Sequence, residues 1–379
     1  MIIFLWIVWS GRVADLHSSL ISNTKPQEPD SDLIINHQAI DPNNLCTPES
    51  FNDGQWEYSK VLDPQNATEN DVAAVSKYTC SEGFHHKCYT RGGDELIRSA
   101  KMVNWKWKPN CQLLNFQPGL LASQIAANPI LFVGDSITEL QYESLKCLLG
   151  KYGDPTEFEL DTKKYSKIFE IQHKVAARFV RSDYFLRLDT WKIQEQGEEP
   201  GPTLGKGFNQ PWANLLPRFR YLVLNTAAHW HKSTLFGENE SLDEMMAAYE
   251  KAINAALDVV QQHQHLTTYV RSSPYGHGNC SLYTEPLQKP NPPNGTVPWE
   301  YEWHLFPKMN ELWKKAIKVR NDPKIKYLDV SRLSELRGDV HSHPNTDCLH
   351  SCIPGYTGPV DDWNKLLHHE MMMDLLDLK

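Results

Sequence analysis

A serine at a predicted strand–helix junction is the first residue of this chain with evident chemical potential. Ser136 closes the tripeptide Gly134-Asp135-Ser136, which follows the apolar run from Ile130 to Val133. Glycine permits a tight turn there, and the free N–H groups and positive dipole end at a helix N-terminus favour an oxyanion beside the serine. A serine in such a setting becomes a nucleophile if a base is near. A helix cap without a catalytic role is the competing interpretation.

The predicted base is His350, which follows Asp347 by three residues. Residues with this spacing share one side of a helical turn, so we expect a turn of helix here. The Asp347 carboxylate can then hold one imidazole nitrogen of His350 while the other takes the serine proton. Asp361 and Asp362 are alternative partners for the imidazole, although they lie further along the chain. A structural histidine in a cysteine-rich loop is the alternative to a base.

Other histidines offer two further interpretations. A metal site would combine the two elements H-x-H and D-x-x-H, which contain His341, His343, Asp347 and His350. That combination matches known zinc patterns only loosely, so we expect no metal. His229 and His231 compete with His350 as the base. We prefer His350, because a carboxylate three residues away can orient it.

Two polar residues follow other apolar runs of the sequence. Asn225 comes directly after residues 221–224, and its amide can donate to a developing oxyanion. An Asx turn at a strand end explains this asparagine as well. Arg271 follows residues 266–270, and it either lines the site or pairs with a surface carboxylate. Ligands bind beyond the carboxyl ends of parallel strands, so we expect Ser136, Asn225 and Arg271 to gather at one edge of a sheet.

Strands and helices alternate over the last two-thirds of the sequence. Short segments rich in apolar and β-branched residues predict strands at residues 130–133, 221–224, 266–270 and 326–330. Helical spacing of apolar residues predicts helices at about residues 137–149, 242–262, 308–319 and 363–378. This alternation predicts an α/β fold whose parallel sheet is covered by helices on both faces.

Composition and cysteine distribution divide the chain into three parts. The 379 residues are 40% hydrophobic and carry a formal net charge of -9. They hold no basic cluster of the kind that nucleic acid requires, so we expect no nucleic-acid partner. Residues 46–118 contain four cysteines and few apolar runs, which predicts a small disulfide-stapled subdomain packed on a catalytic domain of residues 119–379. Residues 10–45 are polar and contain three prolines, and we interpret them as a linker.

Cysteines and glycosylation sequons favour an oxidising compartment. The eight cysteines are Cys46, Cys80, Cys88, Cys111, Cys147, Cys280, Cys348 and Cys352, and the four N-x-S/T sequons begin at Asn66, Asn239, Asn279 and Asn294. The apolar run from Met1 to Trp9 is too short to span a bilayer. We expect it to be the core of a signal peptide or the end of a membrane anchor that tethers the chain. These features together predict the secretory pathway, either the Golgi lumen or secretion.

These motifs resemble those of the SGNH/GDSL hydrolase superfamily. More closely, the chain is similar to the trichome-birefringence-like, PC-esterase group of polysaccharide O-acetyltransferases. The resemblance runs from about residue 46 to the end of the chain. Its motifs are Cys46 with Gly54-Gln55-Trp56; Cys80 and Cys88; Trp105-Lys106-Trp107-Lys108-Pro109-Asn110-Cys111; Gly134-Asp135-Ser136 with Gln141 and Cys147; and Asp347-Cys348-Leu349-His350 with Cys352 and Trp363-Asn364.

The resemblance implies a three-layer α/β/α fold and a role for each site residue. Ser136 would form an acyl-enzyme, His350 would act as the base and Asp347 would orient it. The Ser136 N–H and the Asn225 side chain would form the oxyanion hole. The further oxyanion or substrate-binding residues would be Gly134, Asp135, Gln141 and Arg271. No cofactor is implied, because the acetyl donor is a co-substrate and a polysaccharide or glycan is the acceptor.

The resemblance leaves the reaction and some details open. Release of the acyl group to a sugar hydroxyl makes an O-acetyltransferase, and release to water makes a carbohydrate acetylesterase with the same triad. A non-catalytic glycan-binding protein is the third hypothesis. The resemblance also implies the disulfides Cys46–Cys88 and Cys80–Cys111, with the other four cysteines pairing among themselves. Glu139-Leu140 stand where plant members carry Arg-Asn, a departure that bears on the acceptor sugar.

Overall fold

A computed structural model describes most of the chain after the predicted linker. The described residues are 41–77, 86–153, 166–185, 188–189, 192–193, 212–233, 235–237, 239–295, 301–353 and 358–376. The N-terminal apolar run and Cys80 lie outside them. Within the described part of the chain, no helix has both the length and the apolar character needed to cross a membrane.

The described elements follow one another in this order. Up to residue 118 they are η2 (Pro42–Asn44), α2 (Pro48–Phe51), β1 (Gly54–Tyr58), α3 (Glu69–Ser76), η3 (Cys88–Arg91), α4 (Gly93–Met102) and β2 (Trp105–Pro109). The next are α5 (Pro118–Ala127), β3 (Ile130–Gly134), α6 (Ser136–Leu149), η4 (Gly150–Tyr152), β4 (Ser166–Ile171), β5 (Lys174–Arg181), β6 (Leu188–Asp189), β7 (Lys192–Ile193), η5 (Ala213–Arg218) and β8 (Tyr221–Asn225). The last are α7 (Leu242–Gln261), β9 (Thr267–Arg271), η6 (Cys280–Leu282), η8 (Trp303–Leu305), α8 (Phe306–Arg320), β10 (Ile325–Leu328), α9 (Ser331–Glu335), η9 (Gly338–Val340), β11 (His341–His343), β12 (Asp347–Ser351) and α10 (Pro359–Leu375).

A six-stranded sheet forms the centre of the structure, in the order β10-β9-β8-β3-β5-β4. The first five strands in this order are parallel, and β4 pairs antiparallel with β5. Every residue of β3, β8 and β9 is buried. Burial on both faces explains the nearly continuous apolar runs of β3 and β8 in the sequence. The predicted parallel sheet is therefore confirmed, and β4 and β5 add an edge that the sequence pattern did not predict.

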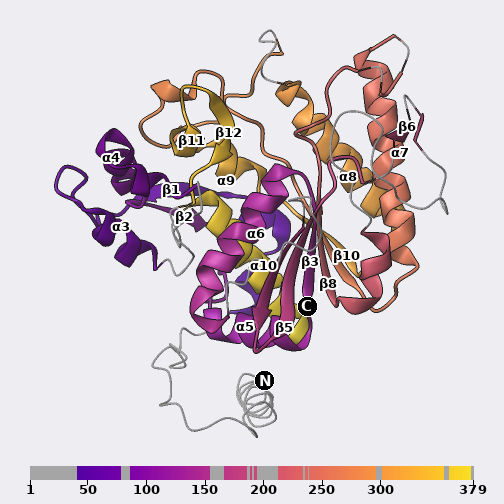
Figure 1. The fold of residues 1–379 in the computed structure, drawn as a ribbon, viewed down its shortest axis with the longest axis horizontal. Helices are drawn as coiled ribbons and strands as arrows, with labels where there is room; N and C mark the ends of the chain where they lie inside the picture. The colour runs from indigo at the N-terminus through magenta and orange to yellow at the C-terminus, as the bar shows by residue number, and fades with distance from the viewer. Residues whose placement is uncertain are drawn as a thin grey trace, which may run out of the picture.

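Helices cover both faces of the sheet (Figure 1). Alternate residues of β3 point to opposite faces. Phe132 packs in the core formed with α5, α6 and α10, whereas Leu131 packs in the core formed with α7 and α8. The predicted three-layer α/β/α fold is confirmed. The last helix begins four residues earlier than predicted, because Gly358 is its N-cap and Pro359 occupies its first turn.

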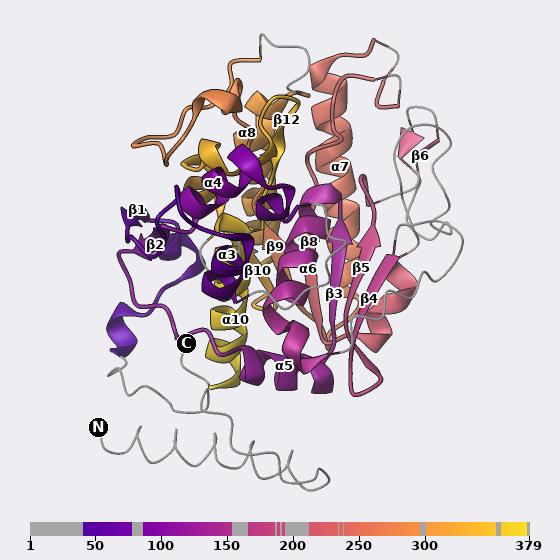
Figure 2. The same cartoon turned by 60° about the vertical axis from the view of Figure 1, so that its left-hand side comes forward.

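Residues 46–118, which we call the N-terminal segment, lie beside the sheet domain. Their two-stranded antiparallel sheet of β1 and β2 and the helix α4 are next to the C-terminal hairpin β11–β12 and α9 (Figures 1 and 2). A small separate core contains Val72 and Tyr89. Trp56 of β1 donates a hydrogen bond of 2.8 Å from its indole N–H to the Leu333 carbonyl of α9. The N-terminal segment thus packs directly on the domain that holds the predicted site.

The disulfide pairing differs from the one that the resemblance implied. Among the described residues the bonds are Cys46–Cys111, Cys88–Cys352 and Cys280–Cys348, and Cys147 is disulfide-bonded as well. The bridge between Leu45 and Gln112 places Cys46 beside Cys111, with Cα atoms 5.0 Å apart. The implied pairs Cys46–Cys88 and Cys80–Cys111 are therefore wrong. The last four cysteines do not pair only among themselves either, because Cys352 is bonded to Cys88. Cys348 and Cys352 do not pair with each other, because each faces a cysteine of a different segment.

Candidate active site

Ser136 is the first residue of α6, directly after the central strand β3. The turn between the two elements requires glycine at position 134. A Cβ atom there would clash with the Asn225 carbonyl oxygen and with the Thr138 side chain. Ser136 therefore stands at the carboxyl edge of the sheet, with its N–H at the positive end of a fourteen-residue helix.

The structure brings Ser136, His350 and Asp347 together. The Ser136 Oγ lies 2.7 Å from the His350 Nε2, and the His350 Nδ1 lies 2.7 Å from the Asp347 Oδ2. A carboxylate accepts, so the hydrogen of the neutral imidazole is on Nδ1. Nε2 then carries the lone pair and faces the serine hydroxyl. This is the arrangement in which an imidazole takes a proton from serine as serine attacks.

The Asp347 and His350 pair lies on a strand, so the predicted helical turn is wrong. β12 pairs antiparallel with β11, and its register shifts between His341 and His343. The Asp347 Oδ1 accepts hydrogen bonds from the N–H groups of Leu349 and His350, at 3.0 and 3.1 Å. The carboxylate therefore folds back along its own strand to reach the imidazole. Burial opposes its charge, but the hydrogen bond and charge of His350 hold the pKa of Asp347 well below its usual range.

The buried Asp135 side chain fixes the turn that carries the nucleophile. It is the N-cap of α6, and its Oδ1 accepts from the Ile137 N–H at 3.0 Å. Its Oδ2 accepts from the N–H groups of Ala227 and Ala228, at 3.0 and 3.1 Å. These bonds join the start of α6 to the loop that follows β8. Asp135 thus shapes the site from inside, and any direct contact with substrate stays a prediction.

The predicted residues Asn225, Arg271 and Gln141 meet in a buried network behind the site. The Asn225 amide donates to the Arg271 carbonyl at 2.9 Å and to the Ser273 hydroxyl at 2.7 Å. The Arg271 guanidinium donates to the Asn225 Oδ1 at 2.7 Å and to the Gln141 Oε1 at 3.0 Å. Both hydrogens of the Asn225 amide are therefore engaged within the protein. Its oxyanion role stays a prediction that requires these bonds to rearrange.

Arg271 has no surface carboxylate as its partner, so that alternative is wrong. Its side chain is fully buried, its hydrogen bonds end on neutral oxygens, and its guanidinium stacks 4.4 Å from the Trp363 ring. Burial without a directly bonded anion lowers the pKa of Arg271 to about 10. The guanidinium holds the ends of β8 and β9 against α6.

Asp361 and Asp362 do not orient His350. The Asp361 Oδ1 accepts from the Ser144 hydroxyl at 2.7 Å, and burial raises the pKa of this carboxyl to about 7. Asp362 forms an ion pair with Lys365. Both carboxyls lie in the first turn of α10, so they belong to the helix cover of the sheet and not to the proposed triad.

His341 lies in a histidine pair behind the catalytic strand. The His277 Nε2 faces the Glu335 carbonyl oxygen at 2.8 Å, and the His277 Nδ1 faces the His341 Nε2 at 2.8 Å. A carbonyl only accepts, so His277 carries its hydrogen on Nε2, and the His341 Nε2 donates to it. Burial lowers the pKa of both histidines. His341 is thus committed to His277, and the structure gives no support to a metal site built on it.

His229 and His231, the competing bases, have other partners. The His229 Nε2 lies 2.8 Å from a guanidinium nitrogen of Arg181. A guanidinium only donates, so this nitrogen accepts and is not available to take a serine proton. The His231 Nδ1 faces the Lys232 carbonyl oxygen at 3.1 Å. His350 is thus the only one of the three candidates that faces Ser136.

A pocket of about 170 Å³ opens beside the triad. Its lining side chains are His86, Ser136, Glu139, Leu140, Glu143, His343, Asp347 and His350. Glu139 forms ion pairs with Lys167 at 2.9 Å and with Arg181 at 3.6 Å. The sequence did not point to His86, because nothing in its spacing links it to the other site residues. Glu139 had one signal, its position three residues after the serine, where the family resemblance implies an arginine.

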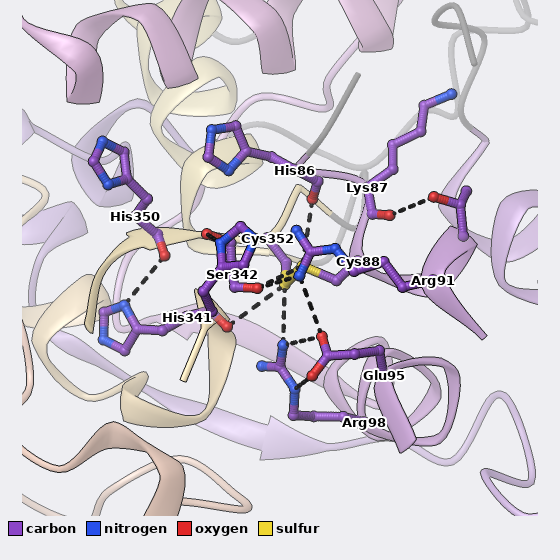
Figure 3. The surroundings of a disulfide bond; sticks show 12 residues. His86, Lys87, Cys88, Arg91, Glu95, Arg98, His341, Ser342, His350 and Cys352 are labelled. Atoms are coloured by element: carbon purple, nitrogen blue, oxygen red, sulfur yellow. Dashed lines mark hydrogen bonds and ion pairs between the residues drawn. A yellow bond between two sulfur atoms is a disulfide. The ribbon is translucent and has the colours of Figure 1, made fainter. Parts of the chain in front are cut away.

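The strand that carries the base is cross-linked on both sides of His350. Cys348 is bonded to Cys280, and Cys352 is bonded to Cys88 of the N-terminal segment. Figure 3 shows the second bond, with His86 and His350 on one side of it and the charged side chains of α4 on the other. There, Arg98 donates to the Asp339 carbonyl at 2.9 Å and pairs with Glu95.

The parallel sheet, its helix layers and the serine at the β3–α6 turn define a GDSL/SGNH-like α/β protein. Residues 113–370 match the model of the PC-Esterase family, described as a GDSL/SGNH-like acyl-esterase family found in Pmr5 and Cas1p. This match covers more than half of the chain, so the chain belongs to the PC-Esterase family. The predicted family is confirmed, and the chain is an enzyme of the acyl-transfer class.

Curated relatives give the comparison more detail. The chain is 27% identical to xyloglucan O-acetyltransferase 3 of Populus trichocarpa, over 77% of this chain and 81% of the relative. It is 22% identical to protein trichome birefringence-like 25 of Arabidopsis thaliana, over 90% and 80%. It is 23% identical to xyloglucan O-acetyltransferase 2 of Arabidopsis thaliana, over 69% and 71%. The similarity to each covers more than two thirds of both chains.

Proposed function

We propose that this protein transfers acetyl groups to hydroxyls of a polysaccharide or other glycan through an acyl-enzyme at Ser136. One observation carries the proposal. In a PC-Esterase family member, the Ser136 Oγ lies within hydrogen-bond distance of His350, which in turn bonds Asp347. The relatives named as xyloglucan O-acetyltransferases support acetyl as the group and a polysaccharide as the acceptor.

The geometry supports a two-step reaction. In the first step the Ser136 Oγ attacks the acetyl carbonyl of the donor, its proton passes to the His350 Nε2, and that proton then goes to the leaving group. In the second step a sugar hydroxyl attacks the acetyl-serine, and His350 takes its proton. The bond between the acetyl carbon and Oγ breaks, and the proton returns to Oγ. Asp347 keeps the imidazole in the required tautomer and stabilises its charged form.

The oxyanion of each step needs N–H donors near Ser136. The Ser136 N–H is one, because the first N–H groups of a helix have no acceptor within the helix. Asn225 is the second donor that the family resemblance implies. Its amide is engaged with Arg271 and Ser273 in this structure, so this role requires a rotation of the side chain. The helix dipole of α6 adds a favourable potential at the same position.

Disulfides and exposed sequons support a secretory location. All four sequon asparagines are exposed and so accessible to a glycosyltransferase: Asn66, Asn239, Asn279 and Asn294. Disulfide bonds form and persist in oxidising compartments. The Golgi lumen or secretion, with tethering through the N-terminal apolar run, is the proposed setting.

Acetyl transfer is measured directly with labelled substrates. Purified wild-type protein is incubated with a labelled acetyl donor and with xyloglucan oligosaccharides, and the masses of the oligosaccharides are measured by mass spectrometry. We expect acetylated oligosaccharides from the wild type and none from Ser136→Ala. Acetylation that persists in Ser136→Ala contradicts the proposed nucleophile. Acetate release that does not respond to any glycan identifies an esterase instead.

A further inference from the structure

The pocket beside Ser136 is lined by both the N-terminal segment and the sheet domain. His86 comes from the N-terminal segment, Glu139 from α6 and His343 from β11. Three regions that are far apart in the sequence therefore place polar side chains around one serine. The catalytic mechanism uses none of these three side chains.

Covalent and hydrogen bonds tie His86 to the catalytic strand. Cys88, two residues after it, is bonded to Cys352. The His86 carbonyl accepts a hydrogen bond of 3.1 Å from the Ile353 N–H. Figure 3 shows His86 and His350 near this disulfide. The position of His86 is therefore fixed relative to the strand that carries the base.

The His86 ring lies nearly parallel to the catalytic imidazole. The rings of His86 and His350 are stacked, with centroids 5.7 Å apart and an angle of 19° between their planes. Both nitrogens of His350 are already engaged, one with Asp347 and the other with Ser136. His86 therefore takes no part in the proton transfer. Its role is therefore to bind the molecule that enters the pocket.

The size and walls of the pocket indicate what that molecule is. Its volume of about 170 Å³ is below the ~300–1,000 Å³ of pockets that enclose drug-sized ligands, so it suits one small group and not several sugar residues. The Glu139 carboxylate accepts hydrogen bonds, and the two histidines can donate or accept. Such a wall matches a ring that carries several hydroxyl groups.

We propose that this pocket is the acceptor subsite and that His86 hydrogen-bonds a hydroxyl of the sugar residue that is acetylated. This inference rests on the proposed O-acetyltransferase function. The neighbouring hydroxyl attacks the acetyl-Ser136 carbonyl carbon and gives its proton to the His350 Nε2. The carbon–Oγ bond breaks, and Oγ regains the proton from His350. By holding the sugar, His86 keeps its hydroxyl, and not water, beside the base.

Replacement of His86 separates acceptor binding from acyl-enzyme formation. His86→Ala should raise the KM for a xyloglucan oligosaccharide about three- to tenfold, the range for one lost hydrogen bond, and divert acetyl groups to water. Labelling of Ser136 by a fluorophosphonate should stay within about twofold of the wild-type rate, because the triad is intact. His86→Gln keeps a hydrogen-bonding group and should recover part of the acceptor KM. His86→Phe keeps the stacked ring and should not.

A matched control and two outcomes complete the test. His173 is exposed between β4 and β5, and His173→Asn should leave both labelling and acceptor KM unchanged. An unchanged acceptor KM in His86→Ala overturns the inference. Two other results overturn it as well, because His86 would then act on His350 and not on the sugar. One is an equal loss of labelling and of transfer in His86→Ala. The other is an acceptor KM that recovers in His86→Phe and not in His86→Gln. Absence of acetyl transfer by the wild type overturns the proposed function as well, and the wild-type measurement alone reveals it.

Discussion

The nucleophile and the base of the proposed site are held by different means. Ser136 follows the central strand of the main sheet, where Asp135 clamps the turn through buried hydrogen bonds. His350 lies on a two-stranded hairpin outside that sheet. Disulfides to two other segments cross-link its strand. The position of the nucleophile therefore follows from core packing, whereas the position of the base depends on covalent bonds.

This difference separates two kinds of damage. A change in the buried network behind Ser136 should lower the stability of the whole fold, because the network joins the strands β8 and β9 to the helix α6. A change in the cross-links of the hairpin should lower the activity of molecules that are still folded. Stability and labelling by an active-site probe can be measured on the same protein, so the two kinds of damage can be distinguished.

The largest effect is expected where the base loses its orientation. Asp347→Asn removes the carboxylate that accepts from the His350 Nδ1, so the imidazole adopts the wrong tautomer. We expect turnover and fluorophosphonate labelling to fall by about 10³- to 10⁴-fold. Thermal unfolding should change little, because Asp347 is only partly buried. Asp94→Asn on the exposed start of α4 is the control, and labelling of Asp347→Asn at the wild-type rate would refute its role.

Removing each of two disulfides with similar spans tests whether a cross-link positions the base. Cys280–Cys348 and Cys46–Cys111 close loops with sequence separations of 68 and 65. Loop entropy then predicts similar losses in the free energy of unfolding, roughly 2–5 kcal/mol, for the two double alanine variants. Only loss of Cys280–Cys348 should slow labelling of the folded fraction, by about 10- to 100-fold, because it frees the strand of His350. Equal labelling in the two variants would show that the cross-link does not position the base.

A smaller effect on the rate of labelling is expected from a change in the buried network behind Ser136. Asn225→Ala leaves an Arg271 N–H and the Ser273 hydroxyl without their partner, so the free energy of unfolding should fall by about 1–3 kcal/mol. Labelling per folded molecule should fall less than in Asp347→Asn. Chemical denaturation and labelling kinetics measure the two effects. A labelling loss of about 10²- to 10³-fold per folded molecule would show that Asn225 also donates to the oxyanion. Unchanged stability would contradict the structural role of its hydrogen bonds.

The prediction with the smallest effect on the chemistry is a pH dependence of stability. Burial raises the pKa of Asp361 to about 7, so the folded chain keeps a proton that the unfolded chain releases near pH ~4. The free energy of unfolding should therefore fall as pH rises from about 4 to 7. Asp361→Asn should reduce this slope, and exposed Asp94→Asn should not. Glu335, with a pKa raised to about 8 by burial, acts in the same direction, so part of the slope should remain. An unchanged slope in Asp361→Asn would contradict the assignment.

The sequence predicted the buried centre of the fold well, for a physical reason. Strands such as β3 and β8 are buried on both faces, so their apolar runs are continuous and stand out. The long helix α7 begins at Leu242, as the spacing of its apolar residues predicts, and Ser241 and Glu244 form a capping box at its start. Strand β5, which lies between β3 and the edge strand β4, mixes buried and partly exposed positions, so it gave no comparable signal.

The proposed site was predictable in part. Ser136, Asp347 and His350 were named from their motifs, and the structure brings them together. The strand conformation of residues 347–351 was not predicted. The Asp347 carboxylate accepts from the N–H groups of Leu349 and His350, and this Asx-type turn brings Asp347 beside His350 as a helical turn would. His86 was missed, since its place depends on a disulfide between residues 264 positions apart. No local pattern encodes such a contact.

Detection of an acetyl group on Ser136 tests the central claim most directly. The wild-type protein is mixed with a labelled acetyl donor without glycan, quenched in acid, digested and analysed by mass spectrometry. We expect label on the peptide that contains Ser136, loss of this label when a glycan acceptor is added before the quench, and no label in Ser136→Ala. Acetyl transfer to glycan without label on Ser136, or with label that persists in Ser136→Ala, would contradict it.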